Sequence, residues 1–356
     1  MQLSHTVDNS HLAQAARLQY VNAGRELQYT ADSAEPASEA VRGLRNLGNT
    51  CYGNALIQAL ARLPLVQRWV REHVDTATKP GFHDPRQCCL CMLARDINHI
   101  TRERSAAPHI PEIMLNRARW NEAFAGTGQQ DATEAFQFLL VACDNVDAAA
   151  LRNLPQYRSL PHREFQHSAV RASTPYNQIF ANLQLMRITC TACNGTSELY
   201  ERETVINLSL ENERLTTLHA RLTEHHAREN LDSAYRCLHC QELGRCNKIT
   251  HVQQWPSVLA VALKRFRFHR RTLTRSKVNR RIEYPLQYLP QAGVQYNLRA
   301  LIEHQGVAGG GHYVAYVRGC SDEWYLCDDR RVSQDRRNVQ QILQTQAYML
   351  FYERSK

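Results

Sequence analysis

One cysteine in this chain stands where a helix start would make its thiol reactive. Cys51 follows Asn49 and Thr50, whose side chains are typical helix caps, and precedes apolar residues with helical spacing. The pattern predicts a helix over 51–62 with Cys51 at its first residue. Because open N–H groups and the helix dipole at such a start favour a thiolate over a thiol, Cys51 is the candidate nucleophile.

A candidate base and its partner lie far downstream. His312 follows three glycines and heads a predicted strand over 312–318, and a second predicted strand over 323–328 ends at Asp328. An antiparallel pairing of the two strands would bring Asp328 near His312, where a carboxylate orients an imidazole and stabilises its protonated form. Each residue alone is more often structural. Together with Cys51 they have the composition of a thiol-protease triad.

Two cysteine pairs have the spacing of metal ligands. Cys190 and Cys193 form one Cys-x-x-Cys motif, and Cys237 and Cys240 form a second. Four thiolates at this spacing complete a closed tetrahedral zinc site, which holds one Zn²⁺ per chain and is structural because it leaves no open position. The alternative is a set of unrelated core cysteines, which paired motifs make the weaker interpretation.

A smaller cysteine cluster lies near the start of another predicted helix. Cys88, Cys89 and Cys91 stand together with His83 close by. No second motif completes this set, so we expect core or surface thiols there and keep a second metal as the alternative.

The composition is that of a folded protein from a reducing compartment. The chain has 356 residues, of which 43% are hydrophobic, so it can bury a large core. No apolar stretch is long enough to span a membrane, and the N-terminus lacks the pattern of a secretory signal. Twelve cysteines in thiol- and metal-type spacings predict an intracellular location in the cytoplasm or nucleus, or in the host-cell cytosol for a pathogen protein.

The formal net charge is +9, and the densest basic run covers 264–281. Nucleic acid is one interpretation of such a run. Because no nucleic-acid module accompanies it, we expect a solvated loop between strands and no nucleic-acid partner.

Helical patterns dominate the first half of the chain and strand patterns the second. Residues 1–42 are interpreted as a partly helical or flexible extension. Helices are predicted over 51–62, 65–74, 90–103, 110–116, 130–145 and 214–226, and strands over 183–190, 197–210, 235–238, 247–254, 258–268, 296–304, 312–318, 323–328 and 347–352. Helices followed by strands predict an α+β fold with a site between two lobes.

Several motifs resemble, in order, those of the ubiquitin-specific protease family. The cysteine box of that family resembles residues 43–52 together with Asn54, Ala55 and Gln58. Its glutamine-aspartate box resembles residues 128–134, and a further family landmark resembles 263–266. Its histidine box resembles residues 311–316 together with 324–329. The resemblance runs from Gly43 to the C-terminus. It implies a papain-like cysteine protease domain over 43–356, with a helical thumb over about 43–150, zinc-ribbon fingers within about 183–260, and a β-sheet palm in the remainder.

The resemblance also implies catalytic roles. Cys51 would be the nucleophile, His312 the general base and Asp328 the orienting acid. Asn46 would donate a side-chain N–H to the oxyanion, and Asp329 is a lesser candidate for polarising the same site.

Ubiquitin has an extended, basic tail that ends in two glycines, so the resemblance implies a groove with acidic groups and a narrow end. The residues assigned to substrate binding are Gln129, Asp131, Glu134, Phe266, Gly310 and Gly311. We expect 267–277 and 305–311 to be mobile loops beside this tail.

The expected activity is that of a ubiquitinyl hydrolase, a thiol protease that cleaves the isopeptide or peptide bond after the diglycine of ubiquitin. Ubiquitin and ubiquitinated proteins would be its partners, with no membrane, and the chain would be a monomer. Two alternatives remain: a protease for a ubiquitin-like modifier, and a catalytically weak ubiquitin-binding scaffold. Two departures from the family pattern, Cys327 in place of an aromatic and the inserted Ala135, concern packing near the site.

Overall fold

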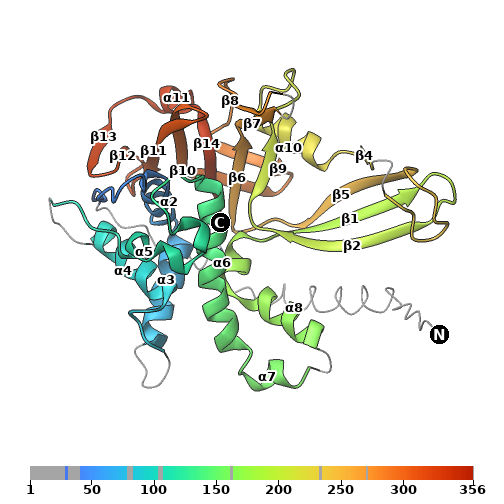
Figure 1. Ribbon diagram of the computed structural model, residues 1–356, viewed down its shortest axis with the longest axis horizontal. Helices are drawn as coiled ribbons and strands as arrows, with labels where there is room; N and C mark the ends of the chain where they lie inside the picture. The colour runs from blue at the N-terminus through green and yellow to red at the C-terminus, as the bar shows by residue number, and fades with distance from the viewer. Residues whose placement is uncertain are drawn as a thin grey trace.

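The computed structural model describes residues 29–30, 41–77, 83–102, 107–160, 163–231, 235–269 and 272–355. These residues form a helical thumb, a palm sheet and a long fingers sheet (Figure 1). The predicted α+β class is confirmed. The helix expected early in the N-terminal extension lies outside the described residues. Among those residues, no helix is both long and apolar enough to cross a membrane.

The thumb is built around helix α2 (Cys51–Leu60), all ten of whose residues are buried. The other thumb helices are α3 (Pro64–Ala77), α4 (Cys89–Arg102), α5 (Glu112–Leu115), η2 (Arg117–Arg119), η3 (Glu122–Phe124) and α6 (Ala132–Leu151). Helices α7 (Pro155–Arg158), α8 (Arg163–Ser173) and α9 (Pro175–Phe180) continue the helical layer past the expected limit near 150. Burial on every side makes α2 the centre of the thumb and explains why its apolar residues are not confined to one face.

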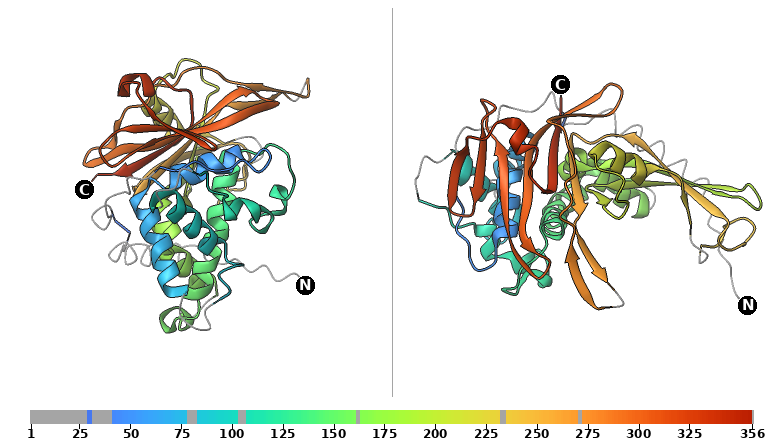
Figure 2. Two further views of the ribbon diagram at one scale, coloured as in Figure 1. Left: turned by 90° about the vertical axis from the view of Figure 1, so that its left-hand side faces the viewer. Right: turned by 90° about the horizontal axis from the view of Figure 1, so that it is seen from above.

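The palm is an eight-stranded sheet in the order β13-β12-β11-β10-β14-β6-β3, with β9 paired to β10. Its strands are β3 (Ile206–Ser209), β6 (Val258–Lys264), β9 (Gln287–Gln291), β10 (Val294–Val307), β11 (Gly310–Arg318), β12 (Trp324–Asp328), β13 (Arg331–Asp335) and β14 (Ala347–Arg354). The short helices α10 (Leu218–His226) and α11 (Val339–Ile342) complete this lobe. Helix α2 packs against β11, and Figure 2 shows the sheet lying across the thumb helices.

The fingers form a second sheet, in the order β2-β1-β5-β4, that extends away from both other parts (Figures 1 and 2). Its strands are β1 (Asn182–Cys190), β2 (Thr196–Glu203), β4 (Glu229–Asn230) and β5 (Cys246–Gln254). The prediction of one strand over 197–210 was wrong, because the chain leaves the fingers after β2 and enters the palm as β3. The predicted strand over 235–238 was also wrong: residues 238–240 form a turn, closed by a hydrogen bond from the Gln241 N–H to the Cys237 carbonyl.

The basic run forms part of a hairpin and is not a solvated loop. Strands β7 (Phe266–His269) and β8 (Thr274–Lys277) pair with each other, and residues 270–271 lie outside the described part. Arg265 is buried and donates to the carbonyls of Ala347, Val278 and Arg280. Lys277 donates to two carbonyls of β10. These cations bind the protein's own backbone; the absence of a nucleic-acid partner stays a prediction.

Candidate active site

Cys51 is the first residue of α2 and is 5% exposed. The loop before it turns through two successive left-handed residues, Gly48 with φ 94° and Asn49 with φ 54°. The Asn46 side chain holds this loop, since its Oδ1 accepts from the N–H groups of Gly48 (2.9 Å) and Thr50 (3.2 Å). These hydrogen bonds fix the path of the loop and so the position of Cys51 at the start of α2.

The expected capping by Asn49 and Thr50 was wrong. Thr50 Oγ1 accepts from the Leu47 N–H inside the loop (2.9 Å), and Asn49 Nδ2 donates to the Thr127 carbonyl (2.8 Å). The Thr50 side chain makes no capping bond to α2. Both side chains therefore brace the loop and do not cap the first N–H groups of α2.

His312 and Asp328 meet through the predicted antiparallel pairing of β11 with β12, in which Ala315 lies opposite Cys327. His312 Nε2 lies 2.7 Å from Asp328 Oδ1. A hydrogen bond with Cys51 and the bond with Asp328 raise the pKa of His312 to about 9, against the desolvation of the ring. The structure thus brings the three predicted residues together from α2, β11 and β12.

Asp329 links His312 and Asp328 to the loop before Cys51, because one of its carboxylate oxygens lies within 4.8 Å of a ligand atom of each of the two residues. It lies just after β12 with φ 47°, a turn that redirects its side chain. Its Oδ2 accepts from Asn46 Nδ2 (2.7 Å) and its Oδ1 from Asn54 Nδ2 (2.7 Å), while its carbonyl accepts from the Leu44 N–H (2.8 Å). Asn54 was not singled out as a site residue. A polar side chain within the apolar α2, one turn after Cys51, was the pattern that could have found it.

Five of the six predicted substrate residues line one open cavity of about 420 Å³: Gln129, Asp131, Glu134, Phe266 and Gly310. The sixth, Gly311, adjoins it. Gln129 Nε2 donates to the Gly311 carbonyl (2.9 Å), and Gln129 Oε1 accepts from the Gly311 N–H (3.1 Å). This amide pair joins the thumb to β11 beside His312 and fixes the floor of the cavity.

The two acids in this cavity have different surroundings. Asp131 caps α6, accepting from the N–H groups of Thr133 and Glu134, and also accepts from the Tyr348 hydroxyl. Glu134 is exposed, and partial burial with the nearby Asp131 charge raises its pKa. Glu134 is therefore the acid with an open carboxylate for a basic ligand, whereas Asp131 organises the wall.

An aromatic wall of the cavity was not predicted. His304 packs edge-on against Tyr313 and Phe266, with ring centroids 4.7 and 5.0 Å apart. Burial and the nearby Lys277 lower the pKa of His304 to about 4, so the ring is neutral. An added Cβ at Gly311 would lie 2.3 Å from the Gln305 carbonyl and 2.4 Å from the His304 ring, so this position requires glycine. Alternation along β10 was the pattern that could have found His304.

The expected mobile loops are paired strands. Residues 305–307 pair with 310–312 in the β10–β11 hairpin, with Gly306 opposite Gly311, and most of 267–277 belongs to the β7–β8 hairpin. Backbone pairing on both sides of the cavity replaces the predicted loops. The narrow end is thus built from regular sheet.

The four predicted metal cysteines converge at the tip of the fingers, with all four sulfurs within 4.8 Å of one another. Cys190 Sγ lies 3.7 Å from Cys240 Sγ, and Cys193 Sγ lies 3.8 Å from Cys237 Sγ. Within each turn, backbone N–H groups point at the sulfurs, from Ala192, Gly195 and His239. The residues after the second cysteine of each pair, Asn194 and Gln241, both adopt a left-handed conformation. This donor set and its two matching turns fit a tetrahedral metal ion.

The family model of ubiquitin carboxyl-terminal hydrolase matches residues 42–352. The chain belongs to this family. Its relatives include ubiquitin carboxyl-terminal hydrolase 17-like protein D of Mus musculus, 28% identical over 323 residues that cover 87% of this chain and 54% of the relative. The 17-like protein 6 of Homo sapiens is 29% identical over 333 residues, covering 90% and 76%. The chain therefore spans about half the length of some relatives it matches.

Among solved structures, the chain resembles the SAGA Ubp8/Sgf11/Sus1/Sgf73 DUB module bound to ubiquitin aldehyde, with a TM-score of 0.71 and 21% identity over 91% of this chain and 71% of that one. A second structure of the module, bound to monoubiquitin, gives a TM-score of 0.72 and 22% identity over the same shares. The predicted papain-like fold of thumb, palm and fingers is confirmed.

Proposed function

We propose that this hydrolase is a deubiquitinating thiol protease that cleaves the bond after the C-terminal diglycine of ubiquitin. The single observation that carries the proposal is the meeting of Cys51, His312 and Asp328 at the junction of two lobes, with His312 Nε2 2.7 Å from Asp328 Oδ1. Family membership supports the same activity. The raised pKa of His312 favours the imidazolium, which is the form that can give a proton to the leaving amine.

The reaction follows from these groups. The Cys51 sulfur attacks the carbonyl carbon of the terminal glycine, and the tetrahedral intermediate collapses to a thioester as His312 gives its proton to the departing amine. Water then attacks the thioester, His312 takes the proton, and the carboxylate and free thiol are released. Asp328 holds the ring in the required orientation and stabilises its charged form.

Asn46 would stabilise the oxyanion in both steps. Its Oδ1 is anchored by the loop before Cys51, and Asp329 orients its N–H-bearing end. Asp329 acts in this proposal as a positioning residue that also holds Asn54. An N–H donor placed beforehand lowers the barrier because it need not reorganise during the reaction.

The substrate tail would lie along the cavity between thumb and palm. Glu134 offers the open carboxylate for a basic side chain, and Gly310 and Gly311 leave the backbone of β11 bare for the diglycine. The family's ubiquitin specificity makes ubiquitin the first choice of modifier, and ubiquitinated proteins the partners. A ubiquitin-like modifier with the same diglycine ending is the second candidate, because the cavity would contact only the C-terminal tail of the modifier.

We further propose one structural Zn²⁺ held by Cys190, Cys193, Cys237 and Cys240. The ion would clamp the ends of β1 and β5 and take no part in the reaction, because four protein ligands leave no open position. Thiolates of this kind require a reducing compartment, which supports an intracellular location. The chain is proposed to act as a monomer.

The decisive experiment uses ubiquitin with an electrophile in place of its C-terminal carboxylate. We expect a covalent adduct that forms on Cys51, shown by mass spectrometry of the modified peptide, and no adduct with Cys51→Ala. Matched probes made from ubiquitin-like modifiers distinguish the second candidate by their relative rates. Tight ubiquitin binding without adduct formation would instead favour the scaffold.

A further inference from the structure

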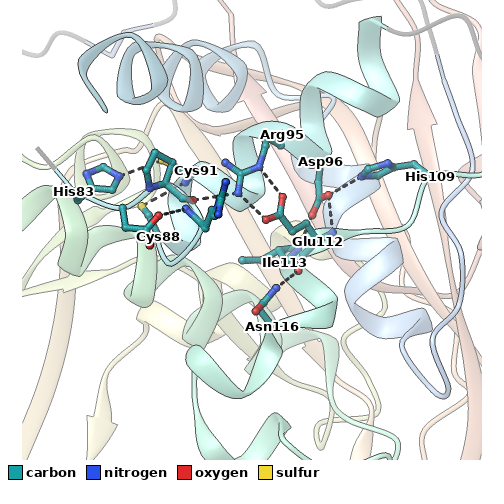
Figure 3. Close-up of polar contacts among 12 residues, drawn as sticks. His83, Cys88, Cys91, Arg95, Asp96, His109, Glu112, Ile113 and Asn116 are labelled. Carbon is teal, nitrogen blue, oxygen red and sulfur yellow. Dashed lines mark hydrogen bonds and ion pairs between the residues drawn. The ribbon is translucent and has the colours of Figure 1, made fainter. Parts of the chain in front are cut away.

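The thumb contains a second cluster of metal-binding side chains, far from the fingers in the sequence. His73 of α3, His83 before α4, Cys88 and Cys91 each place one ligand atom within 4.8 Å of the others. His73, Cys88 and Cys91 are buried, and His83 is half-buried. Figure 3 shows His83, Cys88 and Cys91 gathered at the start of α4.

Each imidazole in this cluster approaches one sulfur. His83 Nε2 lies 3.2 Å from Cys91 Sγ, and His73 Nε2 lies 3.5 Å from Cys88 Sγ. The Cys91 N–H points at Cys88 Sγ (3.5 Å), which repeats the N–H-to-sulfur contacts of the fingers turns. Two sulfurs and two imidazole nitrogens in a compact group are a donor set that zinc prefers.

The Asp147 carboxylate contacts His73 on the side of the ring away from the cluster. His73 Nδ1 lies 3.5 Å from Asp147 Oδ1, and Trp69 Nε1 donates to Asp147 Oδ2 (2.7 Å). A carboxylate on Nδ1 fixes the tautomer whose Nε2 lone pair faces the cluster, as in carboxylate–histidine–zinc arrangements. The buried Trp69 in turn fixes the carboxylate. These contacts orient the His73 ring with its Nε2 towards Cys88 Sγ.

The start of α4 holds both sulfurs. Cys88 immediately precedes the helix and Cys91 lies in its first turn. The alternative to a metal site is two separate S–H···N hydrogen bonds, one for each cysteine–histidine pair. These bonds would explain the two short sulfur–nitrogen distances, but they would not explain why all four ligand atoms lie within 4.8 Å of one another.

We propose that His73, His83, Cys88 and Cys91 bind a second zinc ion, closed to substrate and structural in role. The inference is independent of the proposed activity. The ion would tie α3 and the segment before α4 to the first turn of α4. That turn carries Leu90 and Met92, which belong to the same apolar core as Cys51. Zinc in the thumb would therefore stabilise the helical layer that supports the nucleophile.

The test is a zinc count on the full chain, purified without chelators, by native mass spectrometry and elemental analysis. We expect two zinc ions in the wild type. Cys88→Ser with Cys91→Ser should lose one, and Cys190→Ser with Cys237→Ser should lose the other. The matched control is Cys89→Ser, because Cys89 is a buried thiol of the same helical turn outside the cluster; it should keep both ions.

A second measurement keeps the test valid if the thumb variant misfolds. In Asp147→Asn the four ligands remain, and we expect the zinc dissociation constant of one site to rise by about 10- to 100-fold while the other is unchanged. Cobalt(II) bound to the Cys190→Ser, Cys237→Ser variant should give tetrahedral absorption bands from two thiolates. One zinc ion in the wild type that disappears with the fingers cysteines would overturn the proposal, as would two ions retained without Cys88 and Cys91.

Discussion

The fingers and the thumb–palm junction bring distant residues together by different means. At the fingers tip the only fully buried apolar cluster consists, among the described residues, of Cys190, Cys237 and Cys246, and much of β2 is exposed. At the junction one core extends from Leu44 through α2 to Phe351. The tip has little apolar burial to stabilise it, so the proposed zinc ion would supply that stability, whereas the junction is stabilised by packing.

This difference predicts how each region should respond to a substitution. Removing one metal ligand at the fingers tip should loosen its turns, because only a few backbone hydrogen bonds and one small apolar cluster would then hold them. Removing one polar group at the junction should leave the fold intact and change only chemistry, because the surrounding core keeps its neighbours in place. The predictions below test that contrast, beginning with the largest expected effect.

Replacing the thiol gives the clearest separation of chemistry from fold. We expect Cys51→Ala to reduce hydrolysis of ubiquitin conjugates below about 1% of wild type, since the nucleophile is lost, while thermal stability changes little. Steady-state turnover and thermal unfolding measure the two effects. Cys320→Ala, which removes an exposed thiol, is the control and should keep full activity. Substantial residual turnover in Cys51→Ala would assign the nucleophile elsewhere.

A variant of Asn46 tests whether losing a loop side chain reduces activity nearly as much as losing the Cys51 thiol. We expect Asn46→Ala to lower kcat by about 10²–10³-fold, the usual loss when one oxyanion donor is removed. Its control is Asn49→Gly, which removes a neighbouring amide at a left-handed position where glycine is tolerated. If both variants lose activity equally, the loop geometry and not the oxyanion donor is responsible.

The two neighbouring acids sharpen the comparison within the junction. Asp328→Asn should lower kcat/KM by about 10²-fold, because His312 loses its orienting charge, and Asp329→Asn by about tenfold through Asn46. Steady-state kinetics of the two single variants decide the order. If Asp329→Asn is the more damaging by tenfold, the role of orienting acid moves to Asp329.

The pH profile gives an independent reading of the same pair. The pKa of His312 is raised to about 9, so the imidazolium is present below that pH and is lost as pH rises through it. We expect kcat/KM to fall on the alkaline side near pH 9. In Asp328→Asn this fall should begin at lower pH, because one of the contacts that stabilise the charged ring is gone. An unchanged alkaline limb in this variant would exclude Asp328 as the stabilising partner.

The smallest effect on chemistry should come from the fingers. Cys190→Ser with Cys237→Ser should release zinc and abolish protection of β1 and β5 in hydrogen exchange, while protection of α2 is retained. Cys51 should still react with a small alkylating reagent at close to the wild-type rate. Cys246→Ser, which removes a buried thiol beside the four ligands, is the control and should keep the metal. Loss of protection in α2 would show that the two regions are not independent.

Sequence reasoning found the features that depend on local pattern. The start of α2, the pairing of β11 with β12 and both fingers motifs follow from residue spacing alone, and ordered motifs identified the family. What it missed depends on long-range placement. The bracing role of Thr50 requires the left-handed path of Gly48 and Asn49, and the split of 197–210 between two sheets requires knowledge of each strand's neighbours. His73 joins a cysteine cluster only because α3 returns beside α4.

The bond from the Leu44 N–H to the Asp329 carbonyl has a consequence for synthesis of the chain. It joins the segment before Cys51 to the turn after β12, and the His312 ring also arrives from this late part of the chain. Such contacts between residues far apart in sequence form late in folding. The nucleophile leaves the ribosome early but has no base until most of the chain has followed. A nascent chain that has not yet reached β12 therefore lacks the partners of Cys51 and cannot carry out the proposed reaction.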